Sequence, residues 1–229
     1  MPPIASNLQL IRRRIADSLG TERREVTLVA VSKQQPVDAI REAFAAGCRD
    51  FGESYVQEAL PKLGALGELP ITWHYIGHLQ SNKARDIAGA FDWVHGIDRE
   101  KIGAALGRAR PAGREPLNAC LQVNISGEGT KGGVPPGDAR PLAEALAAVP
   151  GLRLRGLMGM ASPTDDPAEQ RRQFGLLRTT FDGLVEAGLP LDTLSMGMSQ
   201  DLESAVAEGA TMVRVGTALF GERQKRAAA

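Results

Sequence analysis

The chain has 229 residues with 27 acidic and 27 basic side chains, so its formal net charge is zero. A neutral chain lacks the overall field that would attract nucleic acid or anionic lipid. Its two cysteines, Cys48 and Cys120, lie in no CxxC motif, which argues against a disulfide framework and a structural zinc site. There is no signal-peptide pattern and no apolar segment near the ~18 residues of a membrane helix, so we expect a cytoplasmic protein with no nucleic-acid or membrane partner.

Apolar strand patterns alternate with helical patterns along the whole chain. After an amphipathic helix at residues 5–19, eight short apolar segments predict strands, at 26–32, 48–52, 73–77, 91–97, 117–126, 152–161, 191–198 and 211–216. Helical patterns between them are clearest at 36–47, 54–63, 138–149, 168–188 and 200–209. This α/β alternation predicts a single closed (β/α)8 barrel with an extra N-terminal helix, the fold of TIM barrels.

An open, doubly wound parallel sheet is the alternative fold. No GxGxxG motif follows the first strand, and eight units suit closure better than an open sheet. No proline-rich or serine-rich linker divides the chain, so residues 1–229 are expected to form one domain.

The ends of the first, seventh and eighth strands carry the residues that point to chemistry, because barrel enzymes place their sites there. Lys33 ends the first strand in LVAVSKQQP, Ser199 follows the seventh, and Gly216 and Thr217 follow the eighth. Hydroxyls, glycine amides and helix starts after the last two strands are typical of a barrel phosphate site. Strand eight adjoins strand one in a closed barrel, so Lys33 could reach a phosphorylated aldehyde there and form an imine.

Each of these residues also has an ordinary structural interpretation. Lys33 would then be a strand-end lysine that reaches water, Ser199 the N-cap of the helix at 200–209, and Gly216 with Thr217 a plain turn. Arg214, within the eighth strand, must point into the barrel mouth or to an edge, because a buried charge needs partners. From these residues alone, pyridoxal phosphate binding, sugar-phosphate chemistry and a surface lysine all stay open.

The histidines and the glycine-rich segment are weaker signals. His74 and His78 have even spacing in the predicted third strand and would face one side of it, too far apart to share a metal ion. We expect them to line a pocket or cap an element, and we predict no metal site. Ser81 in GHLQSNK is expected to cap a helix, and Lys131 in the loop at 126–137 either contacts an anion or is solvated.

Five long motifs stand between residues 26 and 221: LVAVSK, FGESYVQEAL, WHYIGHLQSNK, LMGM and SMGMSQDLESAVAEGATMVRVGTALFG. They resemble the motifs of the pyridoxal phosphate homeostasis proteins, also called alanine racemase N-terminal-domain-like proteins. The resemblance implies a (β/α)8 barrel similar to that of alanine racemase, with pyridoxal 5′-phosphate held as a Schiff base on Lys33. Ser54 stands where the family commonly has asparagine, so any contact that this side chain makes with the cofactor would be shorter or mediated by water.

The same resemblance implies roles for further residues. Ser199, Gly216 and Thr217 would hold the phosphate, and Met158 of LMGM would belong to the pocket lining. Arg214 would approach the pyridine nitrogen, keep it unprotonated and so weaken the cofactor as an electron sink.

The implied function is carriage and regulation of intracellular pyridoxal phosphate, or vitamin B6 homeostasis, without catalysis. The racemase has a further β-domain that supplies a catalytic tyrosine, whereas Tyr55 and Tyr75 here lie inside barrel motifs and no C-terminal β-domain is expected. We therefore expect a non-catalytic monomer that binds pyridoxal phosphate and related B6 vitamers and serves pyridoxal phosphate-dependent client enzymes. The alternative is a reduced form of a pyridoxal phosphate-dependent amino-acid racemase or decarboxylase.

Overall fold

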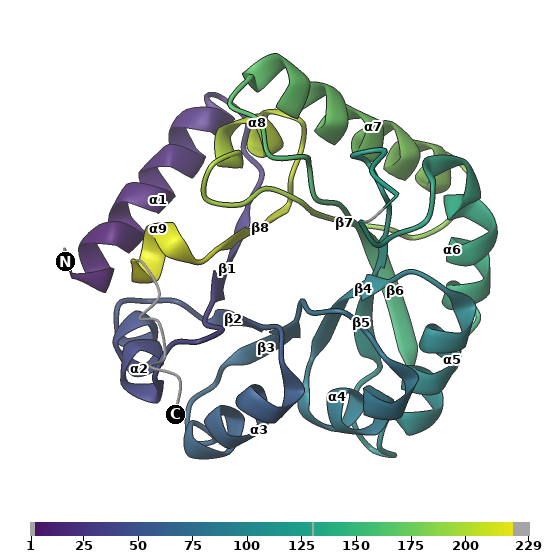
Figure 1. Cartoon of the computed structure of the whole chain (residues 1–229), viewed down its shortest axis with the longest axis horizontal. Coiled ribbons are helices and arrows are strands. Elements are labelled where there is room, and N and C mark those ends of the chain that lie inside the picture. Colours follow the sequence, from purple (N-terminus) through teal and green to yellow (C-terminus); the bar gives the residue numbers. More distant parts are fainter. Residues whose placement is uncertain (1–2, 130, 222–229) are drawn as a thin grey trace.

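The computed structural model describes residues 3–129 and 131–221 and contains a closed barrel of parallel strands. Each strand pairs with the next along the chain, and β8 pairs with β1 (Figure 1). The strands are β1 (Thr27–Val31), β2 (Asp50–Glu53), β3 (Thr72–Tyr75), β4 (Trp93–Ile97), β5 (Leu117–Gln122), β6 (Leu152–Met158), β7 (Thr193–Ser195) and β8 (Met212–Val215). The predicted barrel is therefore confirmed, with strands shorter than their apolar segments.

Helices surround the barrel on its outer side (Figure 1). They are α1 (Ile4–Leu19), α2 (Val37–Ala45), α3 (Val56–Ala65), α4 (Ala84–Ala90), α5 (Glu100–Ala109), α6 (Ala139–Ala147), α7 (Pro167–Glu186), α8 (Leu202–Ala207) and α9 (Thr217–Phe220), with 3-10 helices η1 (Ser81–Lys83) and η2 (Pro136–Asp138). The sequence patterns did not distinguish α4 and α5, whose sequences ARDIAGA and EKIGAALGRA are rich in alanine and glycine. Among the described residues, none of the helices is long and apolar enough to span a membrane.

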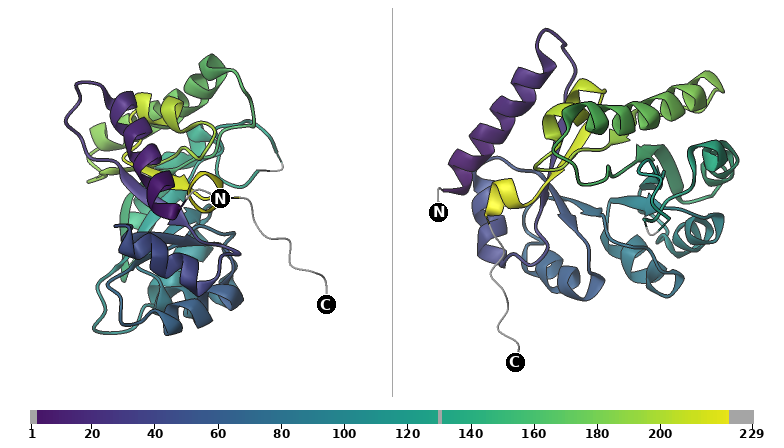
Figure 2. Two further views of the ribbon diagram at one scale, coloured as in Figure 1. Left: turned by 90° about the vertical axis from the view of Figure 1, so that its left-hand side faces the viewer. Right: turned by 45° about the horizontal axis from the view of Figure 1, so that its top comes forward.

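The predicted N-terminal helix is present as α1, and it covers the junction between the first and last strands. It lies along the outside of the barrel beside α8 and α9 (Figure 2). Asn7 Nδ2 donates a hydrogen bond to the Leu219 carbonyl at 2.9 Å, and Arg14 donates one to the Ser199 carbonyl at 3.0 Å. The helix buries the apolar face Leu8, Ile11 and Ile15. This helix therefore supports the loops that follow β7 and β8.

The strands bury side chains on both faces, as expected for a parallel barrel. The outer face forms one core with the helices, and Ala30 and Val213 belong to it. The inner face forms a separate, smaller apolar cluster of Val29, Trp93, Cys120, Met158 and Met212. Alternate residues of a strand point to opposite faces, so the neighbours of Val213 in β8, Met212 and Arg214, face the barrel interior.

Candidate functional site

Ser199 contacts the start of α9, the helix that follows β8, and it does not cap α8. Its Oγ accepts a hydrogen bond from the Ala218 N–H at 3.4 Å. The N-cap residue of α8 is Asp201, whose carboxylate accepts a hydrogen bond from the Met198 N–H at 2.5 Å. The prediction of Ser199 as an N-cap is therefore wrong, because a contact distant in sequence takes its hydroxyl to α9.

Gly216 lies against the end of β1, and Thr217 follows it. Gly216 precedes α9, and a Cβ on it would lie 3.4 Å from both the Cβ and the carbonyl oxygen of Val31. Thr217 is the first residue of α9 and is exposed, so its hydroxyl can reach a ligand. Since Val31 precedes Lys33 by two residues, the structure brings Thr217 and Lys33 to neighbouring strand ends.

Lys33 is half-buried in the turn that follows β1. The next residue, Gln34, has φ 62°, and it is the one non-glycine residue with positive φ in the described part of the chain. A left-handed glutamine is unfavourable, and such strain persists where the surrounding structure holds it, most often at functional sites. The backbone beside Lys33 is therefore held in a particular conformation.

Arg214 points into the barrel, which was one of the two placements expected from the sequence. Its Nη1 donates to the carbonyl and the Oγ of Ser195, at 2.7 and 2.6 Å, and its Nη2 donates to the Gly159 carbonyl at 3.1 Å. Burial lowers the pKa of the Arg214 guanidinium to about 10, so it stays charged at neutral pH. The predicted pocket residue Met158 adjoins Gly159 and is buried in the inner cluster.

A chain of hydrogen bonds runs through the barrel interior from Arg214. Ser195 Oγ, which accepts from Arg214, lies 2.8 Å from His95 Nδ1. His95 Nε2 lies 3.0 Å from His74 Nδ1, and His74 Nε2 lies 3.0 Å from Asp50 Oδ1. Both rings are fully buried. Sequence reasoning missed this chain because its members come from five strands, although a histidine inside an apolar strand was the available signal.

Replacing His95 by glutamine is expected to weaken the pH dependence of stability on the acid side. Burial above all, and then the nearby His74 and Arg214, lower the pKa of His95 well below its ordinary value of 6.5. The folded protein therefore holds His95 neutral, whereas the unfolded chain protonates it as the pH falls below that value. In the unmodified protein, each pH unit below 6.5 should lower the unfolding free energy by about 1.4 kcal/mol because of His95, as measured by urea unfolding.

The exposed histidine His78 provides a matched control for this prediction. His78→Gln should show the same slope of unfolding free energy against pH, on the acid side, as the unmodified protein. In His95→Gln this slope should be smaller by the contribution of about one proton. Equal slopes in all three proteins would contradict the assignment of a neutral, buried His95.

Two minor predictions about the third strand and its loop are wrong. His78 does not lie on β3, because the strand ends at Tyr75, and so it does not share a face with His74. Ser81 begins the 3-10 helix η1, and the N-cap residue there is Gln80, with no capping hydrogen bond from its side chain. In the described part of the chain, no three His, Cys, Asp or Glu side chains are grouped to hold a metal ion.

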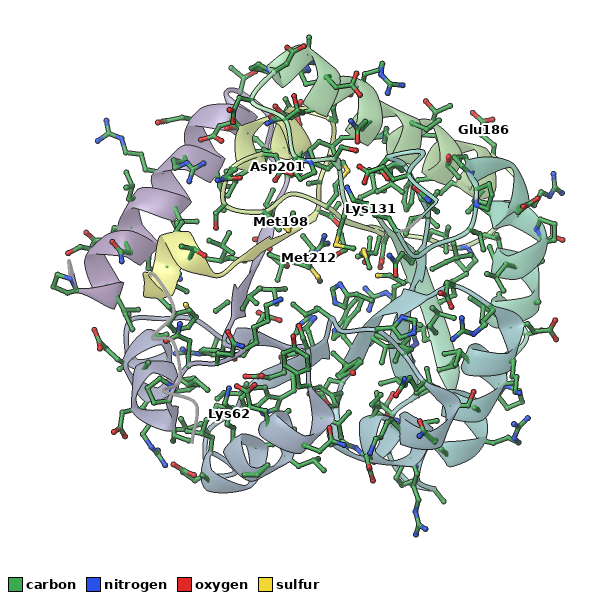
Figure 3. All side chains as sticks on the ribbon, in the orientation of Figure 1. Lys62, Lys131, Glu186, Met198, Asp201 and Met212 are labelled. Carbon is green, nitrogen blue, oxygen red and sulfur yellow. The ribbon has the colours of Figure 1, made fainter. Side chains whose placement is uncertain are left out.

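Lys131 is held between the loops after β5 and β6. Its Nζ donates to the Ala161 carbonyl at 3.3 Å and pairs with Glu128 at 3.0 Å. Figure 3 shows Lys131 nearer the centre of the barrel than Lys62. Glu128 also accepts a hydrogen bond from Ser162 Oγ, so the lysine is part of a loop-to-loop contact and not a solvated side chain.

A second buried polar cluster lies behind Lys33 and was also missed. Glu53 Oε1 accepts hydrogen bonds from Ser32 Oγ at 2.7 Å and from Lys62 Nζ at 2.9 Å. Burial raises the pKa of the Glu53 carboxyl, while Lys62 and Ser32 oppose that shift. The available signal was the position of Lys62 on the same helical face as Val56 and Ala59, where an apolar residue is expected.

Comparison with known proteins places this geometry in a family. Residues 3–224 match the family model for the alanine racemase N-terminal domain. The pyridoxal phosphate homeostasis protein of Pseudomonas aeruginosa is 54% identical over 226 residues, which cover 97% of each chain. The protein of the same name from Escherichia coli K12 is 47% identical and covers 97% of this chain and 98% of its own.

Solved structures agree with these relatives. PipY of Synechococcus elongatus, determined with pyridoxal phosphate bound, has a TM-score of 0.84 and 42% identity, and the match covers 95% of this chain and 100% of PipY. Alanine racemase of Corynebacterium glutamicum has a TM-score of 0.75 at 19% identity, and the match covers 96% of this chain and 61% of the racemase. At that identity the racemase shows the shared fold alone.

Proposed function

The chain belongs to the pyridoxal phosphate homeostasis proteins, a family with the alanine racemase N-terminal domain, and we propose that it binds pyridoxal 5′-phosphate and regulates its availability. The names of its relatives and the cofactor bound to PipY support this proposal. One observation in the chain itself carries it: Ser199 from the loop after β7 contacts the Ala218 N–H of α9. Two loops that supply hydroxyls and backbone amides thus converge beside the strand that leads to Lys33.

The residues at these strand ends fit the phosphorylated cofactor. The exposed hydroxyl of Thr217, the Oγ of Ser199 and the backbone amides around Gly216 are donors suited to a phosphate dianion. A Cβ on Gly216 would only touch Val31 at 3.4 Å, so this glycine is assigned to the site by its backbone amide and by its place after β8. When bound, the cofactor supplies an aldehyde, and Lys33 Nζ is the amine that would condense with it as a Schiff base, releasing water.

We propose that the protein carries the cofactor without using it for catalysis. Arg214 remains charged at neutral pH and would face the pyridine nitrogen, which weakens the cofactor as an electron sink. Racemisation also needs an acid on the face opposite the lysine. Tyr75 is buried and donates its hydroxyl to the His78 carbonyl at 3.2 Å, so it does not offer a free acid. Delivery to client enzymes, the monomeric state and a cytoplasmic location stay predictions from the sequence.

The proposal is tested by the visible absorbance of the purified protein with added pyridoxal phosphate, before and after borohydride reduction. We expect an imine band that reduction removes, and a reduced pyridoxyl group on the peptide that contains Lys33. A protein that takes up no cofactor would overturn the proposal. Steady turnover of many amino-acid molecules per bound cofactor would instead favour a racemase or decarboxylase.

A further inference from the structure

The two peptide groups that flank the Cα of Lys33 are both held by charged side chains of α3. In the peptide group before Lys33, the Ser32 carbonyl accepts a hydrogen bond from Lys62 Nζ at 2.9 Å. In the peptide group after it, the Gln34 N–H donates to Glu58 Oε1 at 2.5 Å. Lys62 and Glu58 form an ion pair of 2.6 Å, so one pair of side chains links the two contacts.

This ion pair is set on the outer side of the barrel wall. The Lys62 side chain is 9% exposed, and its third partner, Glu53, is fully buried at the end of β2. Figure 3 shows Lys62 beside α3, away from the barrel centre. The Ser32 carbonyl, Glu53 and Glu58 use all three donors of the ammonium group. Movement of Lys62 would leave a buried charge unpaired, so the ammonium is fixed in place.

The left-handed backbone of Gln34 needs a hydrogen bond or similar contact to hold it in place. A glutamine at φ 62° would relax toward negative φ if nothing held it. The contact between its N–H and Glu58 opposes that change. Relaxation at Gln34 would rotate the peptide group attached to Lys33 and change the direction of the lysine side chain.

We propose that Lys62 and Glu58 are positioning residues that fix the direction in which Lys33 presents its amine to the phosphorylated aldehyde. They act through the backbone of Lys33 from outside the barrel. The inference rests on the proposed function, because it assumes that Lys33 is the anchoring amine. It adds two residues of α3, outside the loops proposed to hold the phosphate, on which formation of the covalent link depends.

The test compares three variants with the unmodified protein. Lys62→Met removes the ammonium group and keeps the apolar stem, and Glu58→Gln keeps a carbonyl acceptor near Gln34 while removing the charge. Lys101→Met, on the exposed side of α5, is the matched control. Two probes are used: pyridoxal 5′-phosphate, and pyridoxine 5′-phosphate, which has an alcohol in place of the aldehyde. Amide hydrogen exchange of the segment around Gln34 is measured without ligand.

In Lys62→Met we expect pyridoxal phosphate to bind about tenfold or more weakly and pyridoxine phosphate to change by less than about twofold, because charge-assisted hydrogen bonds to the Lys33 segment are lost. Exchange at Gln34 should become faster in the ligand-free variant. Glu58→Gln should change the pyridoxal phosphate affinity and the exchange at Gln34 in the same directions, by smaller amounts than Lys62→Met. It tests the proposal if Lys62→Met fails to fold. Lys101→Met should behave as the unmodified protein.

Unchanged exchange at Gln34 in both α3 variants would overturn the positioning role. An equal loss of affinity for the two phosphates would also overturn it, because it would show a general effect on the fold and not one on the amine. If the unmodified protein binds neither phosphate, the proposed function fails. The exchange measurement then still decides separately whether α3 fixes the backbone at Lys33.

Discussion

Replacement of Lys33 by alanine is expected to abolish the imine band and the borohydride-fixed adduct of pyridoxal phosphate. The reason is chemical: Lys33 follows β1, whose last residue Val31 lies against Gly216, and its Nζ is the amine that we propose forms the imine. The loops after β7 and β8 keep all their hydrogen-bond donors in this variant, so, if they hold the phosphate as proposed, weak and reversible binding should remain. We expect the affinity to fall by at least about tenfold, measured by fluorescence titration and equilibrium dialysis.

The control for this prediction is Lys101→Ala, at an exposed position on α5. It should retain both the band and the adduct. A full imine band in Lys33→Ala, with the reduced pyridoxyl group on another peptide, would show that a different lysine anchors the cofactor. That result would remove the assignment of Lys33 and leave cofactor binding itself intact.

Replacement of Gly197 by alanine is expected to lower the unfolding free energy by about 3 kcal/mol, the sum of backbone strain and steric overlap. Gly197 follows β7 and has φ 90°, a conformation that side chains rarely adopt. A Cβ at this position would lie 2.5 Å from the Cβ of Ala205 in α8, so the helix would have to move. The same loop contains Ser199, and we expect weaker phosphate binding as well.

Gly188 separates the two contributions to this effect. Its φ is 92°, but a Cβ there would meet nothing within 4 Å. Gly188→Ala should therefore show the backbone strain alone, about 1 kcal/mol. Urea unfolding of both variants measures the difference. Equal losses of unfolding free energy would show that α8 accommodates the side chain, and the structural reason given for Gly197 would then be wrong.

The sequence predicted the barrel because its determinants are local. An apolar segment ended by a polar or glycine residue is visible in one window, and each of the eight segments became a strand. The positions of Lys33 and Gly216 just after strand ends were predictable for the same reason, whereas their roles toward a cofactor stay predictions. Helix α4 was not distinguished, since its seven residues, ARDIAGA, are too few to show a clear helical spacing of apolar side chains.

The buried polar groups could not be predicted because their partners are distant in sequence. The hydroxyl of Ser195 contacts a ring nitrogen of His95, 100 positions earlier, and only the closed barrel brings the two together. Ser199 and Asp201 show the same limit on a shorter scale. Both side chains can accept a hydrogen bond at the start of a helix. The sequence does not say that Asp201 will take the N-cap position of α8 and that Ser199 will accept from α9.

Closure of the barrel also constrains the order in which the chain can fold as it leaves the ribosome. One edge of β1 pairs with β8, and α1 packs on α8 and α9, so these two elements wait for partners that are synthesised much later. Contacts between such distant segments close slowly, because the loop entropy is lost before the contacts form. We infer that β1 and α1 stay incompletely paired until β8 has emerged, and that chaperones would encounter this protein with an open edge at β1.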